Sequence, residues 1–227
     1  MISHLFISFS AVQIYVLSYI HLFLVLYSAS RSVIPPKFKS DILFIMDSSS
    51  RVTEDDLRAQ KDFVKSMMAS YNVKRGQSRA ALITYGQNSE KVLRFDSYLS
   101  VNYIESAVDT ATKVGGTARI DKALVDASDV LRDANPSIPK IVVLLTAPDK
   151  GEDPHKESIK VAAQNIHDLG ARVYVLAVGR EPNVEILRHV ADHPQDVFKI
   201  PTFKDLRLNS DSITETIYTR VGELHGF

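Results

Sequence analysis

The chain has 227 residues, and its 27 Lys and Arg residues balance 27 Asp and Glu residues, so its formal net charge at neutral pH is zero. Such a balance gives no bulk attraction to nucleic acid or to an anionic membrane, and we predict no nucleic-acid partner. The sequence has no cysteine, which excludes disulfides, thiolate-bound metals and thiol chemistry.

The first 30 residues contain no Lys, Arg, Asp or Glu, and Leu5 to Tyr27 is mostly apolar. Such a segment is directed to a membrane. The small residues Ser28-Ala29-Ser30 suit cleavage by signal peptidase, so we expect residues 1–30 to be a signal peptide and the protein to be secreted. The alternative is a membrane anchor through residues 5–27, because the apolar run exceeds a usual signal-peptide core and no basic residue precedes it.

The rest of the chain is long enough for one domain with a substantial core. Residues 31–39 contain Pro35-Pro36 between basic residues, which is typical of a linker. We therefore predict a linker over 31–39 and a single domain over 40–224.

Apolar runs alternate with segments of helical periodicity along this domain. We expect strands at Ile42–Met46, Ala80–Tyr85, Glu90–Phe95, Lys140–Thr146, Arg172–Gly179 and Val197–Ile200. We expect one helix whose cap and first turn are Val52–Asp56 and which runs to about Ser70. We expect further helices at Tyr103–Val108, Ile120–Leu131, Lys156–Leu169, Val184–Val190 and from Phe203 onward. Gly86–Ser89 reads as a hairpin turn. The order predicts an α/β fold: a doubly wound, mostly parallel six-stranded sheet with one antiparallel edge strand and helices on both faces.

Polar residues follow the first strand at the point where it ends. Asp47-Ser48-Ser49-Ser50 comes directly after Ile42–Met46, and open α/β sheets place their ligand sites at the carboxyl ends of their strands. The end of the strand Lys140–Thr146 should neighbour Asp47, and Gly115-Gly116 lets the backbone approach closely. The alternative is that Asp47 and the serines only cap the next helix.

Enzymatic chemistry has little support. The sequence has neither G-x-G-x-x-G nor a P-loop nor G-x-S-x-G, which argues against dinucleotide binding, P-loop phosphate binding and serine hydrolysis. A phosphatase of the haloacid-dehalogenase type needs an acid two residues after Asp47, where Ser49 stands. His189 and His193 have metal-ligand spacing without an intervening Glu, so we interpret them as surface residues. We predict that the protein is not an enzyme.

The basic run Lys74-Arg75-Gly76-Gln77-Ser78-Arg79 is typical of a solvated loop between a helix and a strand. Contact with acidic glycans or phosphates is its alternative interpretation.

Several ordered motifs together resemble a von Willebrand factor type A domain, most closely those of collagen VI and matrilin-type matrix proteins. They are Asp47-Ser48-Ser49-Ser50-Arg51, Gly115-Gly116-Thr117, the strand Lys140–Thr146, and Val178-Gly179 followed by Leu187-Arg188-His189-Val190-Ala191. The resemblance covers residues 40–224. It implies a secreted, non-enzymatic adhesion module whose partner is an extracellular protein or a matrix component.

The resemblance also implies a metal-ion-dependent adhesion site, for which Asp47, Ser49 and Thr117 match the family's pattern. Two positions depart from it: Arg51 stands where the family has Ser, and Ala147 where it has Asp. Mg²⁺ and Ca²⁺ need hard oxygen ligands and carboxylate charge, so we predict no bound cofactor. Our hypothesis is that Arg51 pairs with Asp47 and replaces the cation in a degenerate site.

Two alternatives stay open. Asp149, two residues past Ala147, would complete a weak Mg²⁺ or Ca²⁺ site and make the domain a metal-dependent adhesion module. The protein would otherwise be a structural matrix protein that self-associates and uses no such site. In the preferred interpretation, Arg51 or Arg119 meets an acidic partner directly.

Overall fold

The computed structural model describes residues 38–96, 100–148 and 153–227. The expected signal peptide or anchor and most of the linker lie outside these residues, as does Asp149. Within the described ranges, no helix is both long enough and apolar enough to cross a membrane.

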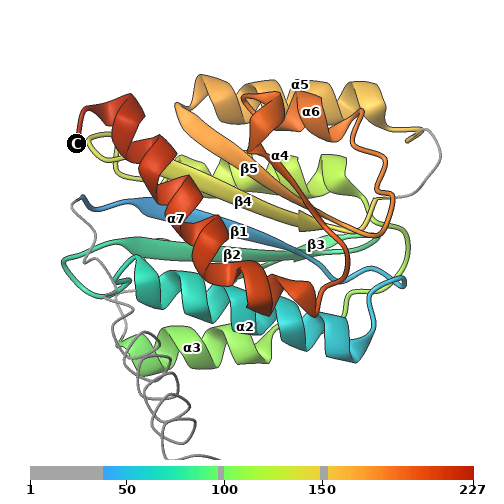
Figure 1. The fold of residues 1–227 in the computed structure, drawn as a ribbon, viewed down its shortest axis with the longest axis horizontal. Helices are drawn as coiled ribbons and strands as arrows, with labels where there is room; N and C mark the ends of the chain where they lie inside the picture. Colours follow the sequence, from blue (N-terminus) through green and yellow to red (C-terminus); the bar gives the residue numbers. More distant parts are fainter. Residues whose placement is uncertain (1–37, 97–99, 149–152) are drawn as a thin grey trace, which may run out of the picture. The chain divides into compact units, whose positions relative to one another are not determined.

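Six strands and their connecting helices alternate along the chain (Figure 1). In chain order they are β1 (Asp41–Asp47), α2 (Glu54–Ser70), β2 (Arg79–Tyr85), β3 (Ser89–Leu93), α3 (Val101–Thr110), α4 (Ile120–Leu131), β4 (Lys140–Thr146), α5 (Lys156–Asp168), β5 (Ala171–Val178), α6 (Leu187–Val190), the 3₁₀ helix η1 (Pro194–Asp196), β6 (Val197–Ile200) and α7 (Asp205–His225).

The sheet has the strand order β3-β2-β1-β4-β5-β6, and every neighbouring pair is parallel except β2–β3. This confirms the predicted doubly wound α/β fold with one antiparallel edge. All seven residues of β1 are buried, as expected for a strand in the middle of a sheet that helices cover on both faces.

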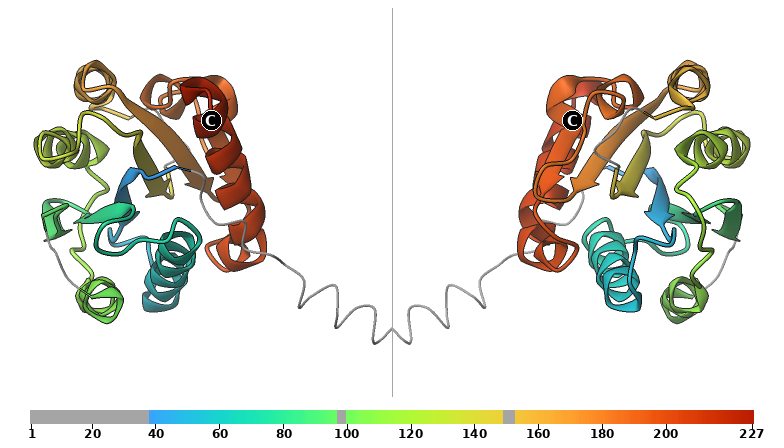
Figure 2. Two further views of the ribbon diagram at one scale, coloured as in Figure 1. Left: turned by 90° about the vertical axis from the view of Figure 1, so that its left-hand side faces the viewer. Right: turned by 90° about the vertical axis from the view of Figure 1, so that its right-hand side faces the viewer.

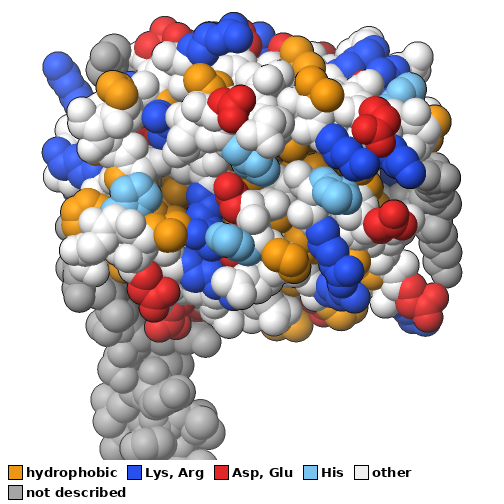
Figure 3. All heavy atoms as spheres, turned by 90° about the horizontal axis from the view of Figure 1, so that it is seen from above, with side chains coloured by type: hydrophobic (Ala, Val, Ile, Leu, Met, Phe, Trp, Pro, Cys, Tyr) orange, Lys and Arg blue, Asp and Glu red, His pale blue; other side chains and the backbone are white. Residues whose placement is uncertain are grey.

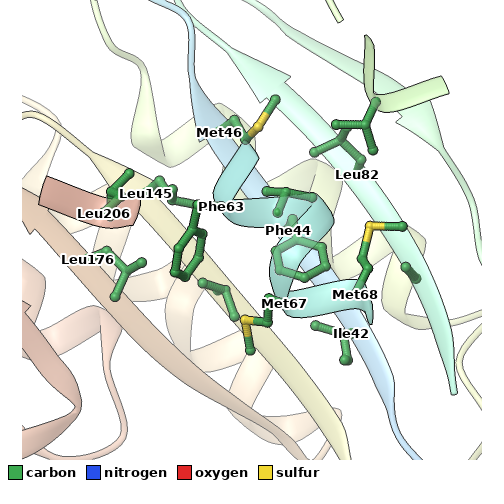
Figure 4. Close-up of a cluster of buried hydrophobic side chains, with 14 of the residues drawn as sticks. Ile42, Phe44, Met46, Phe63, Met67, Met68, Leu82, Leu145, Leu176 and Leu206 are labelled. Carbon is green, nitrogen blue, oxygen red and sulfur yellow. The ribbon is translucent and has the colours of Figure 1, made fainter. Parts of the chain in front are cut away.

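Two apolar cores lie on opposite faces of this sheet. The end-on views show helices on both of these faces (Figure 2). Helices α2, α3 and α7 cover one face, and α4, α5 and α6 cover the other. Alternate residues of β1 serve the two cores: Phe44 and Met46 pack under α2, whereas Leu43 and Ile45 face the second core. Figure 4 shows Phe44 among Phe63, Met67 and Met68 of α2, together with further apolar side chains from the sheet and α7.

Several element ends differ from the predicted ones. Strand β3 ends at Leu93, before the expected Phe95, because a register shift opposite Leu82 and Ile83 disturbs its pairing with β2. Helix α3 starts earlier than expected because the Ser100 side chain accepts a hydrogen bond from the Tyr103 amide and caps it. It also runs past the predicted Val108 to Thr110. The short 3₁₀ helix before β6 was not predicted.

Candidate functional site

Asp47, the last residue of β1, forms the centre of the site. It is completely buried, and its two carboxylate oxygens accept hydrogen bonds from the backbone amides of Ser49 and Ala147, both at 3.0 Å. Burial raises the pKa of Asp47 above its usual value, against the lowering effects of these two amides and, least, of the Arg51 charge. The bond to Ala147 places the end of β4 beside Asp47, as the sequence predicts.

The raised pKa of Asp47 predicts how the stability of the fold depends on pH. The folded state binds this proton at a higher pH than the unfolded state, whose carboxyl has a pKa near 3.8. The group therefore lowers stability at neutral pH, and this cost disappears as the pH falls from the raised pKa towards about 4. We expect the free energy of unfolding of the wild type, relative to that of Asp47→Asn, to rise as the pH falls from 7 to 4.5. Denaturant titrations at several pH values measure this difference. The same comparison with Asp62→Asn, at an exposed acid, should show no such rise, and a difference for Asp47→Asn that is flat with pH would contradict the prediction.

The loop after β1 is held against the glycine loop by backbone hydrogen bonds. The amide of Gly115 donates to the carbonyl of Ser48 at 2.9 Å, and the amide of Ser50 donates to the carbonyl of Gly116 at 2.9 Å. The Ser50 hydroxyl accepts from the Gly116 amide at 2.8 Å, and the Ser48 hydroxyl donates to the carbonyl of Tyr85 at 2.9 Å. Three chain segments far apart in sequence thus form one layer at the carboxyl ends of the strands, on the right-hand side of Figure 1.

Gly86 makes the closest approach in this layer. The Gln87 amide donates to the Gly115 carbonyl, and the Arg119 amide donates to the Gly86 carbonyl, each at 2.9 Å. A Cβ atom on Gly86 would lie 2.1 Å from the Gly115 oxygen, so only glycine fits there. Gly115 and Gly116 both have positive φ angles, of 76° and 69°, which favour glycine.

A small pocket of about 60 Å³ opens at this edge. Arg51 and Thr117 both line it, together with Pro148, Asp153 and Asn183 among others. Thr117 and Arg51 are exposed, whereas Asp47 and Ser49 are buried. The structure therefore brings Arg51 and Thr117 to one accessible surface and keeps the acid below it.

Arg119 has a different environment from the one expected. Its guanidinium forms two hydrogen bonds with the Asp121 carboxylate, at 2.8 and 2.6 Å. This bidentate ion pair holds Arg119 at the start of α4 and lowers the pKa of Asp121 against the opposing effect of burial. Asp149, the remaining predicted site residue, lies outside the described residues.

The described residues supply an incomplete ligand set for a divalent cation. Asp47 is the single carboxylate of the predicted set among them, and both of its oxygens already accept backbone amides. Across the described parts of the chain, no three His, Asp or Glu side chains group as metal ligands. The hydroxyl of Ser49 is buried without a well-formed hydrogen bond, although it lies close enough to Asp47 to help lower the pKa of that carboxyl. The set does not fit the oxygen shell that Mg²⁺ and Ca²⁺ require.

Sequence reasoning missed Ser48, Ser50 and Gly86 as organisers of the site. The hydroxyls of Ser48 and Ser50 bond to residues 37 and 66 positions away, and Gly86 approaches the distant Gly115, so no local pattern reports these contacts. The serine run itself was the available signal, because Ser48 and Ser50 carry the bonds to the other segments while the helix cap is Thr53, in a capping box with Asp56.

One face of the domain mixes both signs of charge. Figure 3 shows Lys and Arg, Asp and Glu, and His side chains interspersed over the face seen from above, without a field of one sign.

Comparisons with known proteins give the family. The family model of the von Willebrand factor type A domain matches residues 41–212. Von Willebrand factor A domain-containing protein 2 of Xenopus laevis is 26% identical over 181 residues, which are 78% of this chain and 22% of that protein. The mouse collagen alpha-4(VI) chain is 26% identical over 170 residues, which are 74% of this chain and 7% of that one. The chain thus spans about a quarter or less of the length of these relatives.

A solved structure, proximal thread matrix protein 1 from the mussel byssus, superimposes with a TM-score of 0.70 at 20% identity, covering 81% of this chain and 47% of that one. A second structure of the same protein, described as having a zinc-occupied MIDAS motif, gives a TM-score of 0.71 at 18% identity, covering 81% and 49%. At this level of identity the likeness shows the fold. Taken with the sequence match over 41–212, it shows that the chain belongs to the von Willebrand factor type A domain family.

Proposed function

We propose that this chain is a secreted, non-enzymatic protein-binding module of the extracellular-matrix type, whose metal-ion-dependent adhesion site is degenerate. Partner recognition would use the loops Asp47–Arg51 and Gly115–Arg119. The observation that carries the proposal is the pocket at the sheet edge, where Thr117 and Arg51 are accessible above a buried Asp47.

The hydrogen bonds that Asp47 already accepts support the proposal that the metal site is degenerate. Two backbone amides already satisfy its carboxylate, so a cation would compete with existing hydrogen bonds. The position that follows β4 is Ala147, which offers Asp47 an amide in place of a second carboxylate. Arg51 adds positive charge near Asp47, where a divalent cation would otherwise be attracted.

The relatives support the matrix setting. Collagen VI chains and a thread matrix protein are among the proteins with similar sequences or folds. An acidic group of a protein or matrix partner would meet Arg51 and the hydroxyl of Thr117, in place of the metal contact that the family's intact site makes.

The test is binding of the full chain to a surface coated with reconstituted basement-membrane extract. We expect binding to be the same in chelator and in excess Mg²⁺ or Ca²⁺. Thr117→Arg should weaken it at least about tenfold, because an arginine side chain fills a pocket of about 60 Å³. Thr112→Arg is the matched control, since Thr112 is also exposed and does not line the pocket.

The outcomes separate the alternatives. Binding that needs a divalent ion, or a melting temperature that rises with that ion, would refute the degenerate site and favour a metal-dependent module. Equal binding by the two threonine variants would refute recognition through this pocket.

A further inference from the structure

A second charged surface lies at the opposite end of the sheet, where the parallel strands begin. It consists of Lys39, just before β1, and Lys74 and Arg75, in the turn between α2 and β2; we call these three residues the basic corner. All three are exposed. The corner lies at the left-hand side of Figure 1, where β1 begins, away from the pocket lined by Thr117.

Ser78 brings the two segments of the basic corner together. Its hydroxyl accepts a hydrogen bond from the Ser40 amide at 3.2 Å, and its carbonyl accepts one from the Lys74 amide at 3.2 Å. Lys39 and Lys74 therefore each lie within one residue of a contact to Ser78. The turn is closed by a hydrogen bond from the Gln77 amide to the Lys74 carbonyl at 3.0 Å, so Lys74 and Arg75 lie on a defined turn.

An aromatic stack fixes the backbone that carries Lys39. The Phe38 ring lies between the rings of Tyr218 and Phe227, with centroids 4.6 and 5.0 Å away and interplanar angles of 4° and 19°. Phe38 itself is buried. Lys39 thus has a buried, stacked residue on one side and the hydrogen-bonded Ser40 on the other.

The charges of the corner are not used within the fold. Among the described residues, no ion pair involves Lys39, Lys74 or Arg75. Arg79, which belongs to the same basic run, differs in this respect: it pairs through two nitrogens with the buried Asp41. Within the basic run, Arg79 therefore has a structural role, whereas Lys74 and Arg75 face the solvent.

We propose that the basic corner binds a sulfated polysaccharide chain. Three exposed cations on two neighbouring segments fit a linear polyanion whose charged groups are spaced along it. A guanidinium matches two oxygens of a sulfate as it does those of a phosphate. The domain has no net charge to attract a broad anionic surface, and this favours a narrow, chain-like ligand over a membrane. The proposal does not depend on the pocket at the other end of the sheet.

The test is retention of the full chain on immobilised heparin as a function of salt. We expect retention that falls with salt, with a slope of log affinity against log salt of about −2 to −3, as for release of counterions at three contacts. Lys39→Glu/Lys74→Glu/Arg75→Glu should weaken binding at least about tenfold at physiological salt. The control Lys113→Glu/Arg188→Glu/Lys204→Glu makes the same change in net charge at exposed, dispersed positions, and should retain most of the affinity.

Several outcomes would overturn the proposal. These are no retention of the wild type, equal losses in the two triple variants, equal retention on desulfated heparin, or binding that is seen only with anionic vesicles or duplex DNA. Melting curves establish that both variants fold. If Lys39→Glu/Lys74→Glu/Arg75→Glu does not fold, Lys39→Gln/Lys74→Gln/Arg75→Gln replaces it, with the same expected loss of affinity. Thr117→Arg should leave heparin binding unchanged, which keeps this result separate from that of the matrix-binding pocket.

Discussion

Asp196→Asn is expected to lower the free energy of unfolding by about 3 kcal/mol, because it removes the carboxylate charge that pairs with two arginines in a mostly buried cluster. Asp196 is completely buried at the end of η1. Its oxygens accept hydrogen bonds from Arg172 at 3.0 Å and from Arg220 at 2.7 Å. The asparagine would leave the two guanidinium groups close together without a compensating carboxylate.

The position of this cluster explains the size of the effect. Arg172 lies in β5 and Arg220 in α7, so Asp196 joins β5 to the last helix. The two side chains are 13% and 25% exposed, so water screens the remaining repulsion only in part. Arg220 also lies over the ring of Phe198, 5.6 Å from its centroid, and this contact depends on its being held in place.

Chemical denaturation of the wild type and Asp196→Asn measures the effect. The control is Asp55→Asn, whose partner Arg58 forms an exposed ion pair with it at 2.9 Å; that change should cost less than about 1 kcal/mol. A loss below about 1 kcal/mol for Asp196→Asn would show that the arginines find other partners or water.

The fold could be predicted because its signals are local and strong. The bounds of α4, β4 and β6 agree with the predicted ones, since a helical repeat of apolar residues or a short apolar run is complete within each segment. The ends of β3 and α3 were harder to predict. A register shift between strands and a serine cap fix them, and the sequence does not report the first of these.

The candidate site was only partly predictable for the same physical reason. Asp47 was predicted to lie in the site because it directly follows an apolar strand, and Thr117 because its loop resembles the family's motif. The pairing of Arg119 with Asp121 was missed, although the two are neighbours in sequence, because a salt bridge depends on side-chain orientation as well as spacing. The cluster around Asp196 was missed because its members are 24 residues apart on each side. Whether Arg51 replaces a cation stays a prediction.

Gly86→Ala is the second change with a large expected effect, and it acts on the site. The new Cβ atom would lie 2.1 Å from the carbonyl oxygen of Gly115 and 3.1 Å from its carbonyl carbon. Both are backbone atoms, so no side-chain rotation relieves the contact and the two loops must separate. We expect a loss of about 3 kcal/mol in the free energy of unfolding, at the upper end of overpacking effects. Gly76→Ala is the control: nothing lies within 4 Å of its Cβ position, and its φ of 79° should cost only about 1 kcal/mol.

The same variant tests whether the site depends on this close approach. Separation of the loops would strain the hydrogen bond from the Gln87 amide to Gly115 and that from the Gly115 amide to Ser48, and so displace Thr117. β1 and β2 end just before these loops, and their buried apolar residues should keep the core folded at moderate temperature. We therefore expect Gly86→Ala to keep its far-ultraviolet circular dichroism while losing binding to the matrix-coated surface, with heparin retention unchanged. Loss of both binding activities would mean that the whole domain had unfolded. If matrix binding persisted in a destabilised variant, partner recognition would have to lie away from the loop of Thr117.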